Sequence, residues 1–257
     1  MTDPTLRFSS RVENYVKYRP RYPREVLKTL QAECGLTSSS VIADIGSGAG
    51  ALSELFLRNG NPVFAVEPNR EMREAAERLL GEYPGFRSVA GRAEASNLEG
   101  RIVDFAVVGQ AFHWFNVPEA RREFLRILKP SGWAMVVWNE REYRTTPFLI
   151  AYDQLLQRHA PEYAREKHRR VYDTALADFF GTGEFVARTF SCKQEMDFAG
   201  VKGRLLSSSY SPEAGHPGHE AMIAELSKIF QAHQVGEHVV FRYMTQMYYS
   251  RMKTPEK

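Results

Sequence analysis

The sequence predicts an α/β fold, a doubly wound, seven-stranded and mostly parallel sheet with a helical cap. Short apolar runs alternate with amphipathic helical stretches between residues 41 and 139, an order typical of parallel strands joined by crossover helices. The length of 257 residues fits one large domain or a domain with a small addition. Apolar residues are 43% of the chain and charged residues 25%, which excludes wholesale disorder, collagen and coiled coil.

Five strands are expected in the alternating region. They cover residues 41–45, 62–66, 86–90, 103–108 and 133–138. Between them apolar residues recur at helical spacing, as they do from Met72 to Leu80. Asn116, Pro118 and Glu119 form a helix-start signature, with the acid three residues after the cap. Residues 129–132 are expected to end that helix.

The strand–helix alternation stops after Asn139. Four features follow: a helix-like stretch at 148–177, a sixth strand at 185–192, a loop rich in Ser, Gly, Pro and His at 207–219, and a helix around 222–230. Residues 239–249 are a plausible last strand. The first 40 residues form a helical preface whose aromatic and basic cluster can fold back over a pocket as a lid. A surface helix with solvated arginines is the alternative.

Charge and cysteine content exclude several classes of protein. Lys and Arg outnumber Asp and Glu by 34 to 31, too small an excess for a dedicated nucleic-acid binder. Cys34 and Cys192 stand far apart without metal-ligand spacing, so neither a disulfide framework nor a metal site is expected. The first ten residues lack a signal-peptide core, and the apolar runs fall short of the ~20 residues that cross a bilayer. We expect a cytoplasmic protein.

A glycine turn after the first strand is the main candidate binding element. Gly46, Gly48 and Gly50 alternate, so a ligand can approach the backbone closely. Asp44 precedes the turn and Glu67 ends the next strand, where a carboxylate can accept hydrogen bonds from ribose hydroxyls. The same residues fit the dinucleotide fingerprint GxGxxG/A, and a tight turn without a ligand is a further possibility.

The chain resembles class I S-adenosylmethionine-dependent methyltransferases. The string Val41-Ile42-Ala43-Asp44-Ile45-Gly46-Ser47-Gly48-Ala49-Gly50 is similar to their motif DxGxGxG, and Val66-Glu67-Pro68-Asn69 to the acidic second motif. Gly91-Arg92-Ala93-Glu94 resembles the adenine-contacting turn, and Phe124 to Gly132 the RxLKPGG segment. Gln110 to Phe115 and Tyr18 to Pro23 are similar to the type 11 branch, which includes trans-aconitate methyltransferase-like enzymes. The implied fold is the Rossmann-like methyltransferase fold.

This resemblance implies a set of donor-binding residues, with S-adenosyl-L-methionine as the cofactor. Gly46 and Gly48 would pass beneath the methionine part, Asp44 would orient the turn and the amino group bound there, and Glu67 would hold the ribose. Pro68 and Ala93 would sandwich the adenine, while Gln110 and Ala111 would close the methionine side. Glu94 and the preface residues Tyr18 and Arg19 complete the set.

Two residues depart from the family pattern. Ser131 replaces the first glycine of the usual pair, a minor change in a turn. Arg92 stands where many relatives carry Asp facing the adenine amino group, so Glu94 or the backbone must take that role.

The acceptor side is defined by fewer residues. His113 follows the fourth strand, where it is a candidate general base or substrate donor; a structural histidine packed between Phe112 and Trp114 is the alternative. Candidate walls of an acceptor pocket are Tyr15, Tyr18, Trp114 and Trp138, although large aromatic residues are more often core. Arg19, Arg141 and Arg144 are candidates to clamp an anionic acceptor, and each could instead lie on a solvated face.

We expect methyl transfer to a small molecule, with a carboxylate as a candidate acceptor, by an in-line mechanism without a metal. The expected organisation is an N-terminal helical lid (1–40), a donor-binding core (41–140) and the rest of the sheet with cap insertions (141–257). The expected partner is the small-molecule acceptor, without nucleic acid or membrane, in a monomer or homodimer. Segment 109–111 lacks the [DN]PP[YF] loop of amino-methylating nucleic-acid enzymes.

Two other classes of function remain open. A nicotinamide-dependent oxidoreductase fits the glycine turn, and Tyr163 to Lys167 spells YxxxK. The TGxxxGxG turn and the partner serine of short-chain reductases are absent, however, so we interpret Tyr163 to Lys167 as helix surface. A non-catalytic cofactor-binding protein of the same fold is the other alternative.

Overall fold

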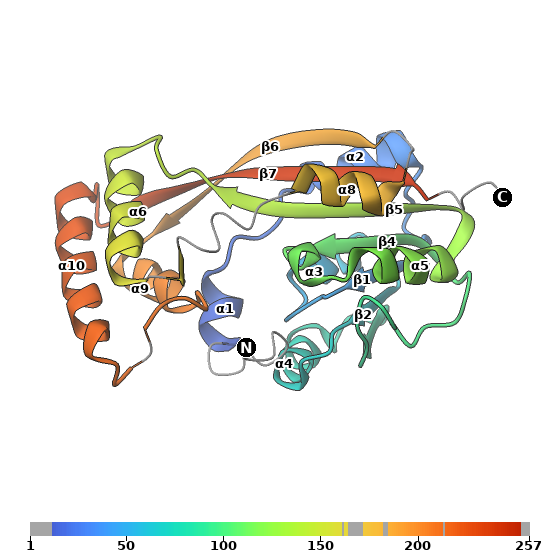
Figure 1. The fold of residues 1–257 in the computed structure, drawn as a ribbon, viewed down its shortest axis with the longest axis horizontal. Helices are drawn as coiled ribbons and strands as arrows, with labels where there is room; N and C mark the ends of the chain where they lie inside the picture. Colours follow the sequence, from blue (N-terminus) through green and yellow to red (C-terminus); the bar gives the residue numbers. More distant parts are fainter. Residues whose placement is uncertain (1–11, 161, 164–171, 182–184, 213, 253–257) are drawn as a thin grey trace.

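The computed structural model describes residues 12–160, 162–163, 172–181, 185–212 and 214–252 (Figure 1). Within these residues, seven strands form one sheet in the order β3-β2-β1-β4-β5-β7-β6. The strands are β1 (Ile42–Ile45), β2 (Val63–Val66), β3 (Phe86–Val89), β4 (Val103–Gly109), β5 (Leu128–Arg141), β6 (Val186–Met196) and β7 (Val239–Arg251). The first five run parallel, and β7 pairs antiparallel with both β5 and β6. The predicted α/β class with a mostly parallel sheet is confirmed.

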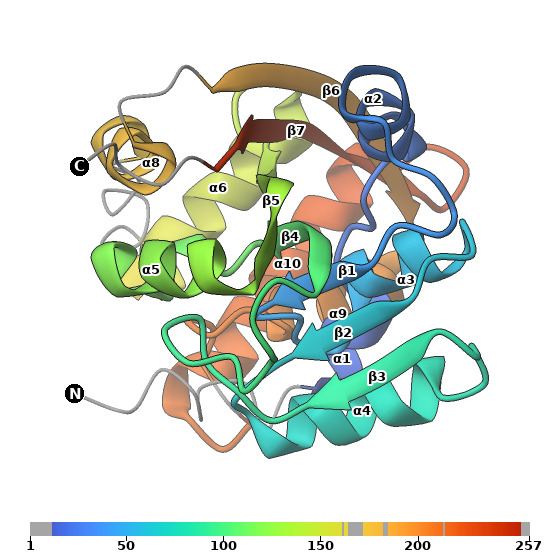
Figure 2. The same ribbon diagram turned by 90° about the vertical axis from the view of Figure 1, so that its right-hand side faces the viewer.

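Helices cover both faces of the sheet, as Figure 2 shows. On one face α2 (Arg24–Cys34), α3 (Ala51–Leu57) and α4 (Arg70–Leu80) pack buried side chains against β1, β2 and β4. On the other face α5 (Val117–Ile127) and α8 (Tyr172–Phe180) pack against the opposite sides of the same strands. Both faces of the central strands are therefore buried, which explains their nearly continuous apolar sequences.

Three strands extend beyond the carboxyl end of β4 and carry a helical cap. Gly109 at the end of β4 pairs with Val137, whereas β5 continues to Arg141, which pairs with Tyr243 of β7. The helices α6 (Pro147–His159), α9 (Phe198–Leu206) and α10 (Pro217–His233) lie around this extension (Figure 1). They form a separate apolar cluster with β7, centred on buried residues such as Tyr152, Leu226 and Phe241.

The first helix of the described chain, α1 (Val12–Tyr18), joins the cap to the core. Its Val16 packs against Ala49, Met72 and Ala75 beside the glycine turn. A Cβ atom on Gly203 of α9 would overlap the ring of Tyr18, so this glycine allows the two helices to meet. The preface thus contacts both sides of the space between the core and the cap.

The structure corrects several predicted element boundaries. Strand β5 begins at Leu128 rather than 133, because Leu128 pairs with Val103 before a register shift. The helix start predicted from Asn116, Pro118 and Glu119 is confirmed, because α5 begins at Val117 with Asn116 as its N-cap. The Asn116 side chain makes no cap bond, however, and its backbone N–H donates to Glu94 Oε1 at 2.9 Å.

Helix α9 lies in a stretch without a helical prediction, because two glycines at 200 and 203 interrupt the apolar pattern that marks helices. The stretch predicted as helix-like, 148–177, contains α6 and the start of α8, while 161 and 164–171 lie outside the described residues. No described helix combines the length and the apolar character needed to span a lipid bilayer.

Candidate active site

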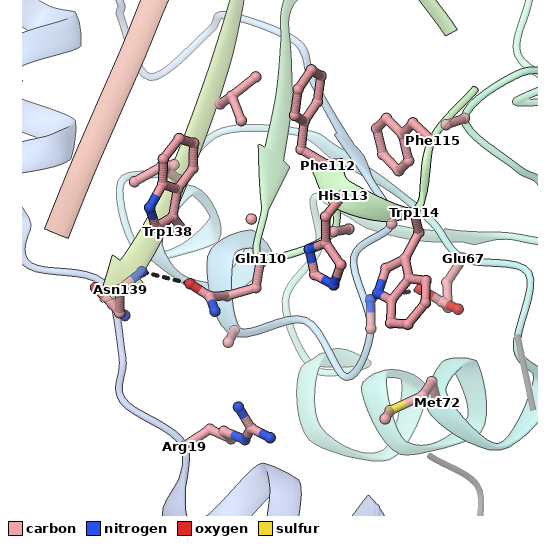
Figure 3. Close-up of a pocket in the computed structure, with 18 of the residues that line it drawn as sticks. Arg19, Glu67, Met72, Gln110, Phe112, His113, Trp114, Phe115, Trp138 and Asn139 are labelled. Atoms are coloured by element: carbon pink, nitrogen blue, oxygen red, sulfur yellow. Dashed lines mark hydrogen bonds between the residues drawn. The ribbon is translucent and has the colours of Figure 1, made fainter. Parts of the chain in front are cut away.

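One cavity of about 710 Å³ runs from the carboxyl ends of β1, β2 and β4 to the cap. At its outer end lie Gly46, Gly48 and Glu67; at its inner end lie Arg141, Arg204 and Tyr210. Gln110, His113 and Trp138 line the middle, and Figure 3 shows His113 between Gln110 and Trp114. The volume lies within the range of about 300 to 1,000 Å³ typical of small-molecule sites.

Each glycine of the turn meets a different structural demand. All three have left-handed backbone angles, with φ of 71° at Gly46, 55° at Gly48 and 86° at Gly50, a region that other residues rarely adopt. A Cβ atom on Gly46 would stand 2.6 Å from Cβ of Ala111, and one on Gly50 would overlap Leu80. A Cβ atom on Gly48 would meet nothing within 4 Å. Gly48 therefore faces open space in the cavity, where a ligand can approach the backbone.

Glu67 stands at the end of β2 with its carboxylate held by backbone N–H groups. Oε2 accepts from Gly48 at 2.9 Å, and Oε1 accepts from Asn69 at 2.9 Å. Burial raises the pKa of this carboxyl, and the Asn69 and Gly48 bonds and the charge of Arg73 oppose that rise. Nη1 of Arg73 also donates to the carbonyl oxygens of Glu67 and Pro68, each at 2.8 Å. The acid is thus fixed at the cavity wall before any ligand binds.

Asp44 lies beneath the turn rather than on the cavity wall. It is fully buried, and its Oδ2 accepts from Ser53 Oγ at 2.6 Å. Burial raises its pKa to about 7; hydrogen bonds from Ser53 lower it, and the charge of Glu67 raises it further. Among the described residues, Oδ1 of Asp44 and Oγ of the buried Ser47 have no hydrogen-bond partner. Both oxygens are enclosed within the turn, away from open space.

The loop after β3 forms the wall next to Glu67 and Pro68. Arg92, Ala93 and Glu94 all line the cavity, with Ala93 buried and Arg92 exposed. Glu94 uses Oε1 to accept the backbone N–H of Asn116, so it ties this loop to the segment that carries His113 and Trp114. The Glu94 carboxylate therefore helps to position this loop, whether or not it also contacts a ligand.

The end of β4 turns sharply into the middle of the cavity. Gln110 has a φ of 60°, an uncommon value for a residue with a side chain. Its Oε1 accepts the backbone N–H of Asn139 at 2.5 Å. Since a backbone N–H can only donate, this bond fixes which end of the amide is the oxygen and leaves the NH2 group of Gln110 as a donor. Ala111, the next residue, packs above Gly46 and also lines the cavity.

His113 and the aromatic residues around it form the central wall. His113 belongs to the short 3-10 helix η3 (Phe112–Trp114) and is exposed towards the cavity, with its ring centroid 4.6 Å from that of Trp114. Trp138 is buried, lines the cavity and stacks on Tyr248 at 5.0 Å. Phe115, which was not predicted as a site residue, also lines the cavity and lies beside Gly46.

Two buried arginines form the inner end of the cavity. The side chain of Arg141 is 9% exposed; its Nη2 donates to Tyr163 Oη at 2.8 Å and lies 3.5 Å from Asp153 Oδ1. Arg204 of α9 is 6% exposed and donates to Tyr243 Oη at 3.3 Å. Within the described residues, Nε of Arg141 has no hydrogen-bond partner.

The solvated-face alternative is therefore wrong for Arg141. Tyr163, interpreted as helix surface, is also corrected: it is buried, donates to Asp153 and lines the cavity. Residues 164–167 of that motif lie outside the described residues. Arg204 and Tyr210 were not predicted as site residues, since the α9 segment has no helical signal in the sequence and Tyr210 lies in a predicted loop.

The preface residues occupy different places. Arg19 lines the cavity and donates to Oγ and the carbonyl oxygen of Ser207, at 3.2 and 3.1 Å. Tyr18 does not line the cavity, because its ring packs against Gly203. The side chain of Tyr15 lies outside the described residues. Arg144 is exposed and does not itself line the cavity, but it lies over the ring of Tyr143, which does.

Comparisons with known proteins point to one family. Residues 43–136 match the family of methyltransferase domains. An uncharacterized methyltransferase of Schizosaccharomyces pombe is 28% identical over 254 residues, 96% of this chain and 97% of the relative. An uncharacterized methyltransferase of Mycobacterium tuberculosis is 34% identical over 142 residues, which cover 55% of this chain and 56% of the relative.

A solved structure supports the same assignment at the level of fold. A candidate type II methyltransferase from Anaeromyxobacter dehalogenans matches with a TM-score of 0.68 at 20% identity, over 91% of this chain and 98% of that one. The glycine turn, the acid at the end of β2 and the antiparallel β7 between β5 and β6 agree with this result. Residues 43–136 thus carry a methyltransferase domain, and the chain is similar in sequence and in fold to the class I S-adenosylmethionine-dependent methyltransferases.

Proposed function

We propose that this protein transfers a methyl group from S-adenosylmethionine to a small molecule that carries a carboxylate. The observation that carries the proposal is a single cavity with the glycine turn and Glu67 at one end and two buried guanidinium groups at the other. A donor and a small acceptor can occupy such a cavity end to end. The family assignment does not favour the nicotinamide-dependent alternative.

The residues at the outer end fit the donor. Gly48 leaves open space above a left-handed turn, where a ligand can approach the backbone. Glu67 would hold the ribose, because its pre-positioned carboxylate can accept hydroxyl hydrogen bonds. Pro68 and Ala93 offer apolar surfaces for the adenine, and Gln110 offers an NH2 donor near the middle. When bound, S-adenosylmethionine supplies a methyl group already activated on its sulfonium.

The charges at the inner end favour a carboxylate. Arg141 and Arg204 give two positive charges and Asp153 one negative charge, so 2 − 1 leaves one positive charge buried there. A buried charge is costly unless it is paired, and a carboxylate supplies one negative charge and acceptor oxygens for the guanidinium groups. The pKa of Tyr210 agrees with a net positive charge at the inner end. Burial alone would raise that pKa, but the charges of Arg141 and Arg204 lower it overall.

The main task of the chain in this reaction is positioning. Holding two reactants in line can supply about 7 to 11 kcal/mol of the barrier reduction, and the aromatic wall of Trp114 and Trp138 would exclude water. A carboxylate acceptor is ionised at neutral pH and needs no base. If the accepting atom is a hydroxyl of the same molecule, His113 is the side chain placed to take its proton.

The test combines a donor-binding measurement with a screen for acceptors. Purified protein and S-adenosylmethionine are incubated with a set of carboxylic acids, matched neutral amides and bulk RNA, and products are detected by mass. We expect a gain of one methylene mass in at least one acid and none in the amides or RNA. Calorimetry with S-adenosylhomocysteine should show binding that Glu67→Gln weakens strongly. Methylation of RNA or amides with no acid product would overturn the proposed acceptor class.

A further inference from the structure

We propose that Glu123 of α5 is a positioning residue for the adenine wall of the donor site. Glu123 lies outside the cavity lining. It acts through the loop formed by residues 91–98, which presents Arg92, Ala93 and Glu94 to the cavity. This inference rests on the proposed function, because the family resemblance gives that loop its adenine-contacting role.

Glu123 is the buried centre of a hydrogen-bond network that reaches the loop. Its Oε1 accepts the backbone N–H of Ser96 at 2.9 Å and also accepts from the Ser96 hydroxyl. Both residues are buried, with Ser96 at 0% and Glu123 at 7% exposure. A carboxylate that accepts from two donors on one residue fixes the position of that residue closely.

Arg126, one turn further along α5, completes the network. It donates to Glu123 through Nε and Nη2, both at 2.7 Å, and Nη2 also donates to the carbonyl oxygen of Leu98 at 2.7 Å. Burial raises the pKa of Glu123, but the bonds from Arg126 and Ser96 outweigh it and lower that pKa overall. Glu123 is therefore ionised at neutral pH, and its charge holds both Ser96 and the arginine that grips Leu98.

Displacement of Ser96 would reach the cavity wall through a tight turn. Arg92 and Ala95 exchange backbone hydrogen bonds of 2.9 and 3.1 Å, so the residues between them move as a unit. Gly91 packs so closely beneath the carbonyl of Ser96 that a Cβ atom there would overlap it. Asn97, at a φ of 61°, donates to the carbonyl of Ala90 at 2.7 Å and closes the loop. The loop is thus a small rigid unit whose anchor on α5 is Glu123.

The same helix begins beside the acceptor wall. The backbone N–H of Asn116, just before α5, donates to Glu94 of the loop. Glu123, further along α5, fixes the other side of the loop. The loop is therefore attached to this one helix at two points. A loop pre-positioned in this way loses little freedom on binding adenine, and such preorganisation increases affinity without new ligand contacts.

The experiment measures donor affinity and turnover in matched variants. Glu123→Ala removes both contacts, Glu123→Gln keeps an acceptor for Ser96 but loses the charge, and Ser96→Ala removes only the hydroxyl. Arg122→Ala is the control, since Arg122 lies on the same helix with a side chain 75% exposed. The readouts are calorimetric affinity for S-adenosylhomocysteine and for 5′-methylthioadenosine, thermal stability, and kcat at saturating donor with an acceptor found in the screen of carboxylic acids.

We expect Glu123→Ala to weaken affinity for both adenosine ligands by about tenfold or more, the range for loss of a charged hydrogen bond. Glu123→Gln should lie between Ala and wild type, and kcat at saturating donor should stay within about twofold in every variant that folds. Arg122→Ala should bind as wild type does. If Glu123→Ala does not fold, Ser96→Ala and Glu123→Gln give the same comparison.

Two results would overturn the inference. One is wild-type affinity for both adenosine ligands in folded Glu123 variants, even with lower thermal stability, since that pattern describes a structural residue alone. The other is a fall in kcat at unchanged affinity, which would place the effect outside the adenine wall. Absence of binding in the wild-type protein would instead refute the proposed function.

Discussion

Replacing Gly48 with alanine separates ligand contact from backbone strain at the glycine turn. Gly48 has a φ of 55°, and its missing Cβ points into open space in the cavity. Gly35 provides a matched control at the end of α2, with a φ of 71°, no atom within 4 Å of a built Cβ, and no place in the cavity. The two substitutions therefore introduce similar strain, but only Gly48→Ala adds a methyl group where the donor would lie.

The expected magnitudes follow from these two environments. An L-residue in the left-handed region costs roughly 1 to 2 kcal/mol, so both variants should lose about this much free energy of unfolding. An extra methyl group in a close-fitting site costs typically about 1 to 3 kcal/mol, which corresponds to roughly 5- to 150-fold weaker binding. That loss of affinity should occur in Gly48→Ala alone.

Two measurements check the prediction. Urea unfolding gives the stability of each variant, and titration calorimetry gives its affinity for S-adenosylhomocysteine. Unchanged affinity in folded Gly48→Ala would refute the reasoning, because it would mean that the ligand does not lie over the turn. Equal loss of affinity in Gly35→Ala would attribute the effect to stability instead.

Three further predictions concern other parts of the site. The ordinary pKa of Asp44 is 3.8 and its pKa in the folded protein is about 7, so between these pH values the folded state binds a proton that the unfolded state has lost. The free energy of unfolding should therefore fall as pH rises from about 4 to 7, by up to about 1.4 kcal/mol per pH unit. Asp44→Asn should flatten this slope, as measured by urea unfolding at several pH values. Arg141→Met should raise the KM for a carboxylate acceptor roughly thirtyfold or more, since truncating one partner of a buried charge pair costs about 2 to 5 kcal/mol. An unchanged KM would count against an anion at the inner end of the cavity. The affinity for S-adenosylhomocysteine serves as the control and should stay the same. Gly203→Ala should displace α1, because the new Cβ would overlap Tyr18; limited proteolysis should then cut the preface faster, and adding Tyr18→Ala should restore protection if the overlap is the cause.

The sequence predicted the donor end of the site because its residues are close in the chain and carry local signals. Gly46, Gly48 and Gly50 are needed by the backbone angles of one turn. Glu67 follows the next strand, and parallel strands bring both segments to one edge of the sheet. Local periodicity likewise located the seven strands, although it placed the start of β5 five residues late.

Tertiary structure decided which residues surround the acceptor. Arg141 ends β5, Tyr163 follows α6, and Arg204 and Tyr210 belong to α9 and the segment after it. Each of these residues, taken alone in the sequence, looks like part of a polar surface, and it is the extension of β5 and β7 past β4 that brings them together under the cap. The same is true of Glu123. The pattern of residues around it indicates only a helix, and its burial against Ser96 depends on a loop more than twenty residues away in the chain. The positions of the strands along the chain follow from patterns a few residues long, whereas burial of a charge depends on contacts between distant segments, which no local pattern encodes.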